Sequence, residues 1–308
     1  MKTLITGGAG FIGSHLTKRL LSEGNEVYVV DNLSSGKEEN VPKKAFFIQE
    51  DITNQEEVEK IFKINFDNVV HLAAIISPGE IKKEPLKHIE LNIKAPLNLF
   101  KLAKRYGVNK FINTSSMAVY GNPQTPFVNE QSPLTPVSLY GLGKLITEYN
   151  SLLMSSNKLN IITTRLFNVY GPGQDIEDTR SGMLRIFLNY VYHNKPISVK
   201  GTLERFRDFV YVADVVNAIS LILKGSNLKH KVYNVCSGRK TTIRQLLDLI
   251  ISSFGKDPEH YPIKITRRMR GDIYGVYGDN SRIKAELGWK PEVSLEKGVL
   301  KTVKASLR

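Results

Sequence analysis

Residues 6–13 read TGGAGFIG, and this glycine-rich run restricts the possible folds more than any other segment. An apolar segment, KTLIT, precedes it, and a helical pattern, FIGSHLTKRLLSEG, follows it. Gly7, Gly10 and Gly13 have the spacing G-x-x-G-x-x-G. Such glycines allow a tight strand-to-helix turn, the approach of a pyrophosphate to backbone N–H groups, and close packing of the helix on the strand. A plain turn would explain the glycines equally well unless other residues support a phosphate site.

That support comes from a carboxylate after the second apolar segment. EVYVV at 26–30 is followed by Asp31. A carboxylate there can accept hydrogen bonds from the adenosine ribose hydroxyls and would repel a 2′-phosphate. The glycines and Asp31 together favour NAD over NADP. Asp51 and Ile52 follow the third apolar segment, where an adenine could rest, although Asp51 could equally begin the next helix.

The first half of the chain alternates short β-branched runs with longer helical patterns, which is typical of parallel strands joined by crossover helices. We expect an α/β fold of the Rossmann type, with a doubly wound parallel sheet that is buried on both faces. The expected strands are 2–6, 26–30, 45–49, 68–72, 110–114 and 160–165.

The pattern changes after about residue 170, where GPGQ marks a turn at 171–174. Helical patterns follow at about 180–193, 214–225, 242–255 and 295–307. No linker separates the two parts. We therefore expect an NAD-binding domain over 1–170 and a smaller α/β lobe over 171–308 that binds substrate and in part could return to the sheet.

Composition narrows the function classes. The net charge is +13, but the basic residues are scattered, which favours anionic small molecules over nucleic acid. Cys236 is the only cysteine, so no internal disulfide forms, and no Cys/His spacing indicates a metal site. No apolar run reaches the roughly 18 residues of a membrane span, and no signal peptide is visible. We expect a cytoplasmic protein without membrane segments.

A second motif carries chemistry. In PVSLYGLGK, Tyr140 and Lys144 are four residues apart, hence adjacent on one helix face. Tyrosine titrates near pH 10 in water, too high for a base at neutral pH. A neighbouring ammonium and an oxidised nicotinamide would favour the phenolate, so we expect Tyr140 to accept a proton. Ser116, at the end of a predicted strand, could hydrogen-bond the same substrate oxygen. An ordinary exposed pair is the alternative for Tyr140 and Lys144.

These residues carry a family resemblance. The chain resembles the extended short-chain dehydrogenases/reductases, specifically the NAD-dependent nucleotide-sugar epimerases and dehydratases, and among them most of all the 4-epimerases of UDP-galactose and UDP-glucose. The resemblance covers nearly the whole chain, and the matching motifs, in order, are GGAGFIG, DNLSSG, HLAA, SSMAVYG, YGLGK, RLFNVYGPGQ, RDFVYVADV and ELGWKP.

The resemblance implies roles residue by residue. Tyr140 matches the catalytic base, Lys144 its partner, and Ser116 the residue that orders the sugar 4-hydroxyl. The cofactor residues it implies are Gly7, Gly10, Phe11, Ile12, Gly13, Asp31, Asn32, Ser35, Gly36, Asp51, Ile52, Leu72, Ala73, Ala74, Asn92, Thr114, Tyr140, Lys144 and Phe167.

The resemblance also implies contacts to a UDP-sugar, with Asn168 and Arg207 at the diphosphate. The full substrate set is Ser77, Ser116, Met117, Tyr140, Asn168, Arg207, Arg268, Arg270 and Asp272. Two departures stand out. Met269 occupies the slot of a phosphate arginine, so Arg268 or Arg270 would have to replace it, and Phe206 stands where many relatives have a polar residue.

The reaction follows from what is missing. Relatives that eliminate water or carbon dioxide carry carboxylates just after the catalytic serine or threonine, whereas this chain has Met117 and Ala118. Epimerisation at C4 through a keto sugar needs no extra acid or base. The alternatives are another nucleotide sugar (UDP-N-acetylhexosamine, UDP-glucuronate or a UDP-pentose), a 4-keto reductase, or a silent NAD-binding protein. Ser77, Met117 and Val276 are expected to influence sugar size, and the helices at 85–106 and from about 138 to form a homodimer.

Overall fold

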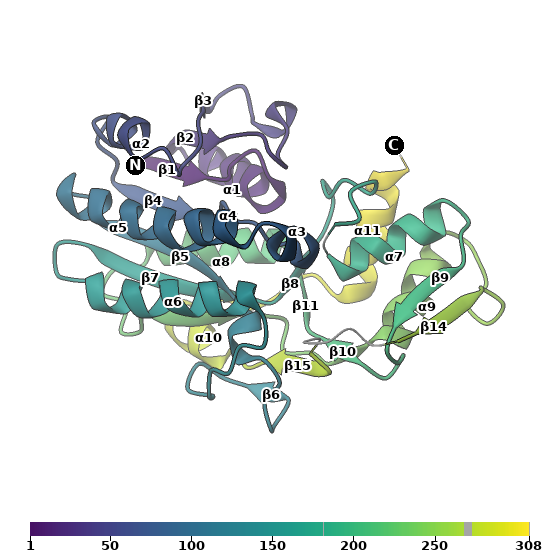
Figure 1. The fold of residues 1–308 in the computed structure, drawn as a ribbon. Helices are drawn as coiled ribbons and strands as arrows, with labels where there is room; N and C mark the ends of the chain where they lie inside the picture. The colour runs from purple at the N-terminus through teal and green to yellow at the C-terminus, as the bar shows by residue number, and fades with distance from the viewer. Residues whose placement is uncertain (181, 268–272, 308) are drawn as a thin grey trace.

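The central sheet of this computed structural model, which describes residues 1–180, 182–267 and 273–307, consists of parallel strands (Figure 1). Its spatial order is β12-β7-β5-β4-β1-β2-β3, and every neighbouring pair is parallel. The expected doubly wound parallel sheet is therefore confirmed. The strands are β1 (Lys2–Thr6), β2 (Glu26–Asp31), β3 (Phe46–Gln49), β4 (Asn68–His71), β5 (Lys110–Ser116), β7 (Asn160–Leu166) and β12 (Val232–Val235).

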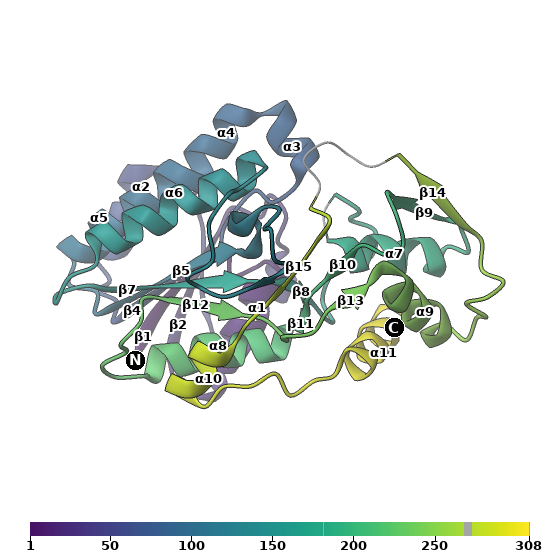
Figure 2. The same ribbon diagram turned by 90° about the horizontal axis from the view of Figure 1, so that it is seen from below.

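Helices cover both faces of this sheet (Figure 2). On one face lie α2 (Gln55–Phe62), α5 (Ala95–Arg105) and α6 (Leu139–Met154). On the other lie α1 (Phe11–Ser22), α8 (Val212–Lys224) and α10 (Ser281–Leu287). Strand β12 and helix α8 belong to this layered unit although they lie beyond residue 170, because β12 pairs with β7 and α8 packs against α1.

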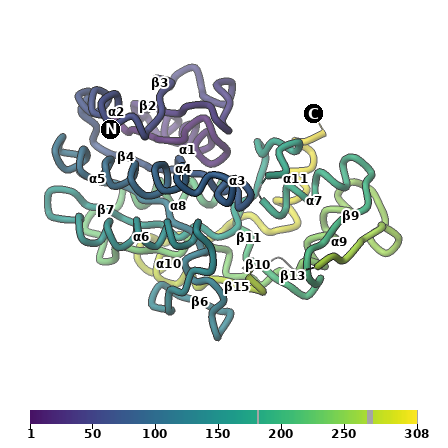
Figure 3. The backbone as a smooth tube through the Cα atoms, in the orientation of Figure 1, coloured from purple at the N-terminus to yellow at the C-terminus, as the bar shows by residue number. Residues whose placement is uncertain are grey.

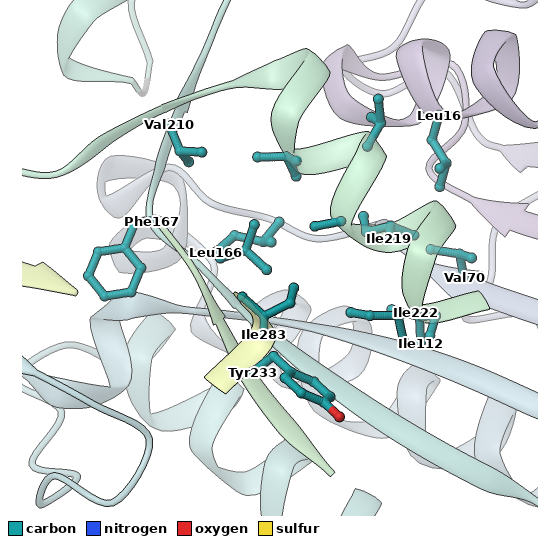
Figure 4. Packing of buried hydrophobic residues seen from close by; sticks show 14 of the residues in the cluster. Leu16, Val70, Ile112, Leu166, Phe167, Val210, Ile219, Ile222, Tyr233 and Ile283 are labelled. Carbon is teal, nitrogen blue, oxygen red and sulfur yellow. The ribbon is translucent and has the colours of Figure 1, made fainter. Parts of the chain in front are cut away.

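The main core lies between the sheet and the α1–α8 layer (Figure 4). Val70 of β4 and Ile112 of β5 meet Ile219 and Ile222 of α8, and each of the four is fully buried. Branched side chains on central strands match the expectation of a sheet buried on both faces. This packing holds the carboxyl ends of β1, β4 and β5 at one edge of the sheet, which is where the functional residues lie.

The rest of the chain forms a second lobe around α7 (Met183–Tyr192), α9 (Ile243–Ser253) and α11 (Leu295–Ser306), separate from the sheet in Figure 3. The capping box formed by Thr242 and Gln245 begins α9. The lobe contains two small sheets, one of β9 (Ile197–Lys200) with β14 (Ile263–Thr266), and one of β13 (Thr241–Thr242), β10 (Phe206–Arg207), β15 (Gly275–Gly278) and β6 (Phe127–Val128). Strands β8 (Asn168–Tyr170) and β11 (Phe209–Tyr211) connect the lobe to the sheet.

The expected helix at 85–106 is continuous but irregular. It consists of α4 (Pro85–Ile89), a π-helical turn at Glu90–Lys94, and α5. Such π turns within α-helices are frequent at functional sites. The helix α3 (Pro78–Lys83) precedes it, and short 3-10 turns lie at Glu38–Asn40 and Met117–Tyr120. Within the described ranges, no helix combines the length and apolarity needed to cross a membrane.

Candidate active site

The glycine-rich turn lies where the strand order of the sheet reverses, between β1 and β4. Gly7 has φ +75°, and a Cβ atom there would lie 2.6 Å from the backbone nitrogen of Ala73, in the loop after β4. A Cβ on Gly13 would lie 2.2 Å from the carbonyl oxygen of Gly7. The two strand ends therefore approach so closely that only glycine fits, which opens the start of α1 to a phosphate ligand.

Asp31, at the end of β2, fastens this turn. Its carboxylate accepts hydrogen bonds from the backbone nitrogens of Ala9 (3.0 Å) and Leu33 (2.9 Å). Burial raises the pKa of Asp31, and these two hydrogen bonds oppose the shift. Gly36 closes the following loop against Ala9, since a Cβ on Gly36 would lie 2.8 Å from the Ala9 carbonyl carbon. A carboxylate held beside the turn suits the ribose hydroxyls of NAD.

A cleft of about 990 Å³ runs along these strand ends. Its volume is in the range of cofactor sites and leaves room for a second ligand. Most of the predicted cofactor residues line it: Gly7, Gly10, Phe11, Ile12, Gly13, Asp31, Asn32, Ser35, Gly36, Ile52, Leu72, Ala73, Ala74, Thr114, Tyr140, Lys144 and Phe167. The residues at the adenosine end therefore fit a dinucleotide in both shape and chemistry.

Tyr140, Lys144 and Ser116 meet at the other end of this cleft. Ser138 caps α6 by accepting a hydrogen bond from Gly141 at 3.1 Å, so Tyr140 and Lys144 lie in the first turns of the helix. The hydroxyl groups of Tyr140 and Ser116 are hydrogen-bonded. Lys144 Nζ donates to the carbonyl of Thr114 at 2.8 Å and lies 5.9 Å from the centroid of the Tyr140 ring.

The pKa of Tyr140 reflects the burial of its side chain. Burial raises it to about 12, although the hydrogen bond with Ser116 opposes the shift. Burial also lowers the pKa of Lys144 to about 8, against the charge of Glu148. In the protein alone, desolvation therefore disfavours the phenolate more than the neighbouring protein groups stabilise it. That Lys144 together with an oxidised nicotinamide favours the phenolate stays a prediction.

Four predicted site residues with described positions do not line the cleft: Asp51, Asn92, Met117 and Arg207. Asp51 bonds Asn32 Nδ2 at 2.8 Å and its own helix-entry turn at Thr53. Asn92, 2% exposed, fastens the backbone of Ile75 at 2.8 and 2.7 Å. Met117 packs against the main core. These side chains shape the cleft from behind it.

Arg207, for which the resemblance implies a diphosphate contact, is bonded to backbone carbonyls. It is 4% exposed, and its guanidinium donates to the carbonyls of Phe206 (2.7 Å) and Ile273 (2.7 Å). Val276, expected to influence sugar size, is fully buried. Phe206 packs on Gly275 beneath Lys240, away from the cleft. Arg268, Met269, Arg270 and Asp272 lie outside the described residues, so their predicted roles stay predictions.

The cleft also contains charged residues that the motifs did not indicate. Ser77, Ser116 and Asn168 line it, and so do Glu80 of α3, Gln174, Asp178 and Arg180 of the segment that connects β8 to α7, and Arg185 of α7. Asp178 bonds Arg180 (2.8 Å) and Arg185 (3.2 Å). The only available signal was the GPGQ turn after a strand end, because the charges that follow it have no characteristic spacing.

Comparisons with known proteins agree with this geometry. The model of the family described as NAD dependent epimerase/dehydratase matches residues 3–236. The UDP-glucose 4-epimerase of Thermotoga maritima, solved with UDP-glucose, is 37% identical with a TM-score of 0.93, covering 99% of this chain and 98% of that one. The UDP-glucose 4-epimerase of Thermus thermophilus, solved with NAD, is 34% identical with a TM-score of 0.91, covering 100% and 99%.

A relative with a different reaction is nearly as similar. UDP-glucuronic acid decarboxylase 1 of Xenopus tropicalis is 32% identical over 308 residues, which span 98% of this chain and 71% of that protein. Identity at this level establishes the family and the cofactor and leaves the sugar open. With its dinucleotide cleft and the family match over most of its length, the chain belongs to the NAD-dependent epimerase/dehydratase family and is an NAD-dependent enzyme of the UDP-sugar type.

Proposed function

We propose that this enzyme interconverts UDP-galactose and UDP-glucose by epimerisation at C4. The observation that carries the proposal is the meeting of Tyr140, Ser116 and Lys144 at the cleft end beyond the dinucleotide turn, with Met117 and Ala118 following Ser116. A base for the 4-hydroxyl is present, and neither residue after Ser116 can move a second proton. This combination suits oxidation and reduction at one carbon better than elimination.

The protein residues divide the work at the sugar 4-hydroxyl. Bound NAD supplies the hydride acceptor and, while oxidised, a positive charge. Tyr140 removes the hydroxyl proton, and Ser116, which lies beside the phenol, hydrogen-bonds the same substrate oxygen and thereby aligns it. Lys144, held by the Thr114 carbonyl, adds positive charge beside the ring. The resulting 4-keto sugar must turn its opposite face toward the cofactor before reduction, so the residues around it must leave it room.

The nucleotide must stay anchored while the sugar turns. Asn168, Gln174 and Arg185 line the cleft beyond Tyr140, and Arg185 presents a guanidinium whose side chain is 11% exposed. Guanidinium groups bind diphosphates through charge-assisted hydrogen bonds. The structure of the Thermotoga maritima relative with UDP-glucose supports assigning this end of the cleft to a UDP-sugar.

The test is to incubate the purified protein with UDP-galactose, with and without added NAD, and to follow the anomeric protons by NMR. Appearance of UDP-glucose up to a constant ratio, without net reduction of cofactor, is expected. No conversion of either sugar would contradict the proposal. The same assay with UDP-N-acetylglucosamine and a UDP-pentose maps the substrate range.

A second candidate is epimerisation of UDP-glucuronate, which Arg180 and Arg185 favour because a sugar carboxylate could pair with a cleft-lining guanidinium. The decarboxylase relative is named for this same sugar acid. UDP-glucuronate in the NMR assay separates the outcomes, since epimerisation gives UDP-galacturonate and decarboxylation releases carbon dioxide and a UDP-pentose.

We also infer a homodimer built on α4–α5 and α6. Apolar side chains on these helices are exposed, with Leu86 at 75% and Leu153 at 83%, and Leu139, Leu142 and Tyr149 continue along the same surface of α6. A second copy would cover both helices. Light scattering is expected to give twice the chain mass for the wild type and a monomer for Leu142→Glu.

A further inference from the structure

His88 occupies a buried position between the cofactor side of the cleft and the catalytic helix. It lies in the last turn of α4, two residues before the π-helical segment, and is 2% exposed. Neither the glycine motif nor the tyrosine motif includes it. Its two ring nitrogens point to two different elements, so it connects parts of the molecule that are distant in sequence.

The hydrogen bonds determine the form of this imidazole. His88 Nε2 lies 3.0 Å from the carbonyl oxygen of Leu139, which can only accept, so Nε2 carries the proton. Nδ1 then accepts from Asn92 Nδ2 at 2.9 Å. The side chain of Asn92 also donates to the carbonyl of Ile75 at 2.7 Å and accepts from its nitrogen at 2.8 Å. Every polar atom of the His88 and Asn92 side chains is thereby satisfied.

The two ends of this chain of hydrogen bonds are both functional. Ile75 lines the cleft in the loop after β4. Leu139 immediately precedes Tyr140 and begins α6. The path Ile75–Asn92–His88–Leu139 therefore connects the wall of the cofactor cleft to the backbone that carries Tyr140. Burial and the charge of Lys144 lower the pKa of His88, which agrees with a neutral ring.

Gly143 shows how closely the imidazole approaches α6. A Cβ at Gly143 would lie 3.0 Å from His88 Nε2 and 3.2 Å from Cε1. The second glycine of YGLGK thus leaves the space that His88 fills. It lies one residue before Lys144, on the same turn as the proposed catalytic pair.

We propose that His88 is a positioning residue, which holds the first turn of α6 so that Tyr140 faces the substrate site. This inference rests on the proposed role of Tyr140. His88 should affect turnover without contacting the ligands, because its ring is buried behind the helix.

Three substitutions separate the two bonds of the ring. Gln places a donor near the Nε2 position, Asn places an acceptor near the Nδ1 position, and Phe keeps the size without either. We expect His88→Phe and His88→Asn to lower kcat at least tenfold with KM for the UDP-sugar within twofold, and His88→Gln to recover most of kcat. His230→Asn, at an exposed position, is the control and should match the wild type.

Amide hydrogen exchange supplies a readout independent of turnover. His88→Phe should accelerate exchange in the first turn of α6, and His88→Gln should restore protection. If the wild type turns over no UDP-sugar, the proposed function fails, while this exchange pattern still tests the positioning role. Equal kcat in all variants, or exchange unchanged in α6, would overturn the inference. If His88→Phe does not fold, the Gln and Asn pair gives the same comparison.

Gly143→Ala provides a second test. When His88 is present, the methyl group of the introduced alanine should displace the imidazole and lower kcat. This loss is expected even though alanine has a higher helix propensity than glycine. In the shorter His88→Asn background the same substitution should have little further effect. Additive losses in the double variant would contradict contact between the two positions.

Discussion

The two ends of the cleft are built in different ways. The cofactor end depends on backbone geometry, with Gly7 and Gly13 at positions where a Cβ would collide with the main chain, and with Asp31 bonded to backbone nitrogens. The end that we propose for the sugar depends on long charged side chains such as Arg180 and Arg185, which are held by Asp178. The first end therefore tolerates few changes of residue type, whereas at the second end the exchange of a side chain leaves the backbone in place.

This difference explains why the family match identifies the cofactor and not the sugar. Backbone collisions restrict residue types at short, regular spacing, so they leave a motif. Ion pairs such as Asp178–Arg185 require no fixed spacing in the sequence, so they leave no motif. Substitutions on either side of Tyr140 locate the boundary between the two ends.

The largest effect is expected at that boundary, where Tyr140 meets both ligands. Tyr140→Phe removes the proton acceptor and keeps the ring, so turnover should fall about 10²–10⁴-fold while both ligands still bind. Steady-state rates together with NAD content by absorbance measure this. If the variant loses bound NAD together with its activity, the role of Tyr140 is cofactor binding and not proton transfer.

A smaller but broader effect is expected at the cofactor end. Gly13→Ala places a Cβ 2.2 Å from the Gly7 oxygen, so the turn must shift. We expect about 1–3 kcal/mol lower stability and a tenfold or greater loss of NAD affinity. Urea unfolding and calorimetric titration of NAD measure these two quantities.

Gly79→Ala is the matched control, because its Cβ would meet only the Ser77 hydroxyl, at 3.9 Å. It should leave NAD affinity unchanged. If Gly13→Ala also binds NAD normally, the steric account of the cofactor end is wrong.

The fold could be predicted further than the site. Strands such as 2–6 and 26–30 alternate with helical patterns, and the structure extends β5 and β7 only slightly beyond the predicted ends. Strand β12 was not predicted, because VYNV is short and its place beside β7 depends on the return of α8 to the sheet. Local patterns carry no information about such long-range pairing.

At the site, the motifs indicate which backbone segments lie near the cleft, whereas the direction of each side chain becomes visible only in the structure. Asn92 and Met117 lie in the expected segments, but their side chains face Ile75 and the core. Arg207 follows the same rule, since its guanidinium meets carbonyls of Phe206 and Ile273. A motif locates a backbone, whereas the direction of a side chain depends on tertiary neighbours.

Asp31→Asn tests cofactor selectivity at the cofactor end. The substitution removes the charge that disfavours a 2′-phosphate and keeps one acceptor for Ala9 or Leu33. We expect NAD to bind about tenfold more weakly, close to the value of one hydrogen bond to a charged group, and the preference for NAD over NADP to narrow. Calorimetry with both cofactors measures it. Asp51→Asn, which lies behind the cleft, should change neither affinity.

The smallest expected effect is a loss of stability at low pH, and it should arise at the cofactor end and not at the other end. Burial lowers the pKa of His71, at the end of β4 beside the glycine turn, to about 3. Between about pH 6.5 and 3 the unfolded chain therefore binds a proton that the native chain refuses, so the free energy of unfolding falls as the pH falls. One such group contributes about 1.4 kcal/mol per pH unit, or about 2 kcal/mol from pH 6.5 to 5.

The sugar end should not share this loss. A hydrogen bond from Arg180 lowers the pKa of Asp178 to about 2, so its ion pairs persist until the pH falls through that value. Urea unfolding at pH 6.5 and 5 should show a shallower decline for His71→Asn than for the wild type, with exposed His230→Asn as the control. Equal declines in all three proteins would mean that His71 takes up its proton in the native state. In that case the cofactor end would be more accessible to water than its close backbone packing and buried side chains imply.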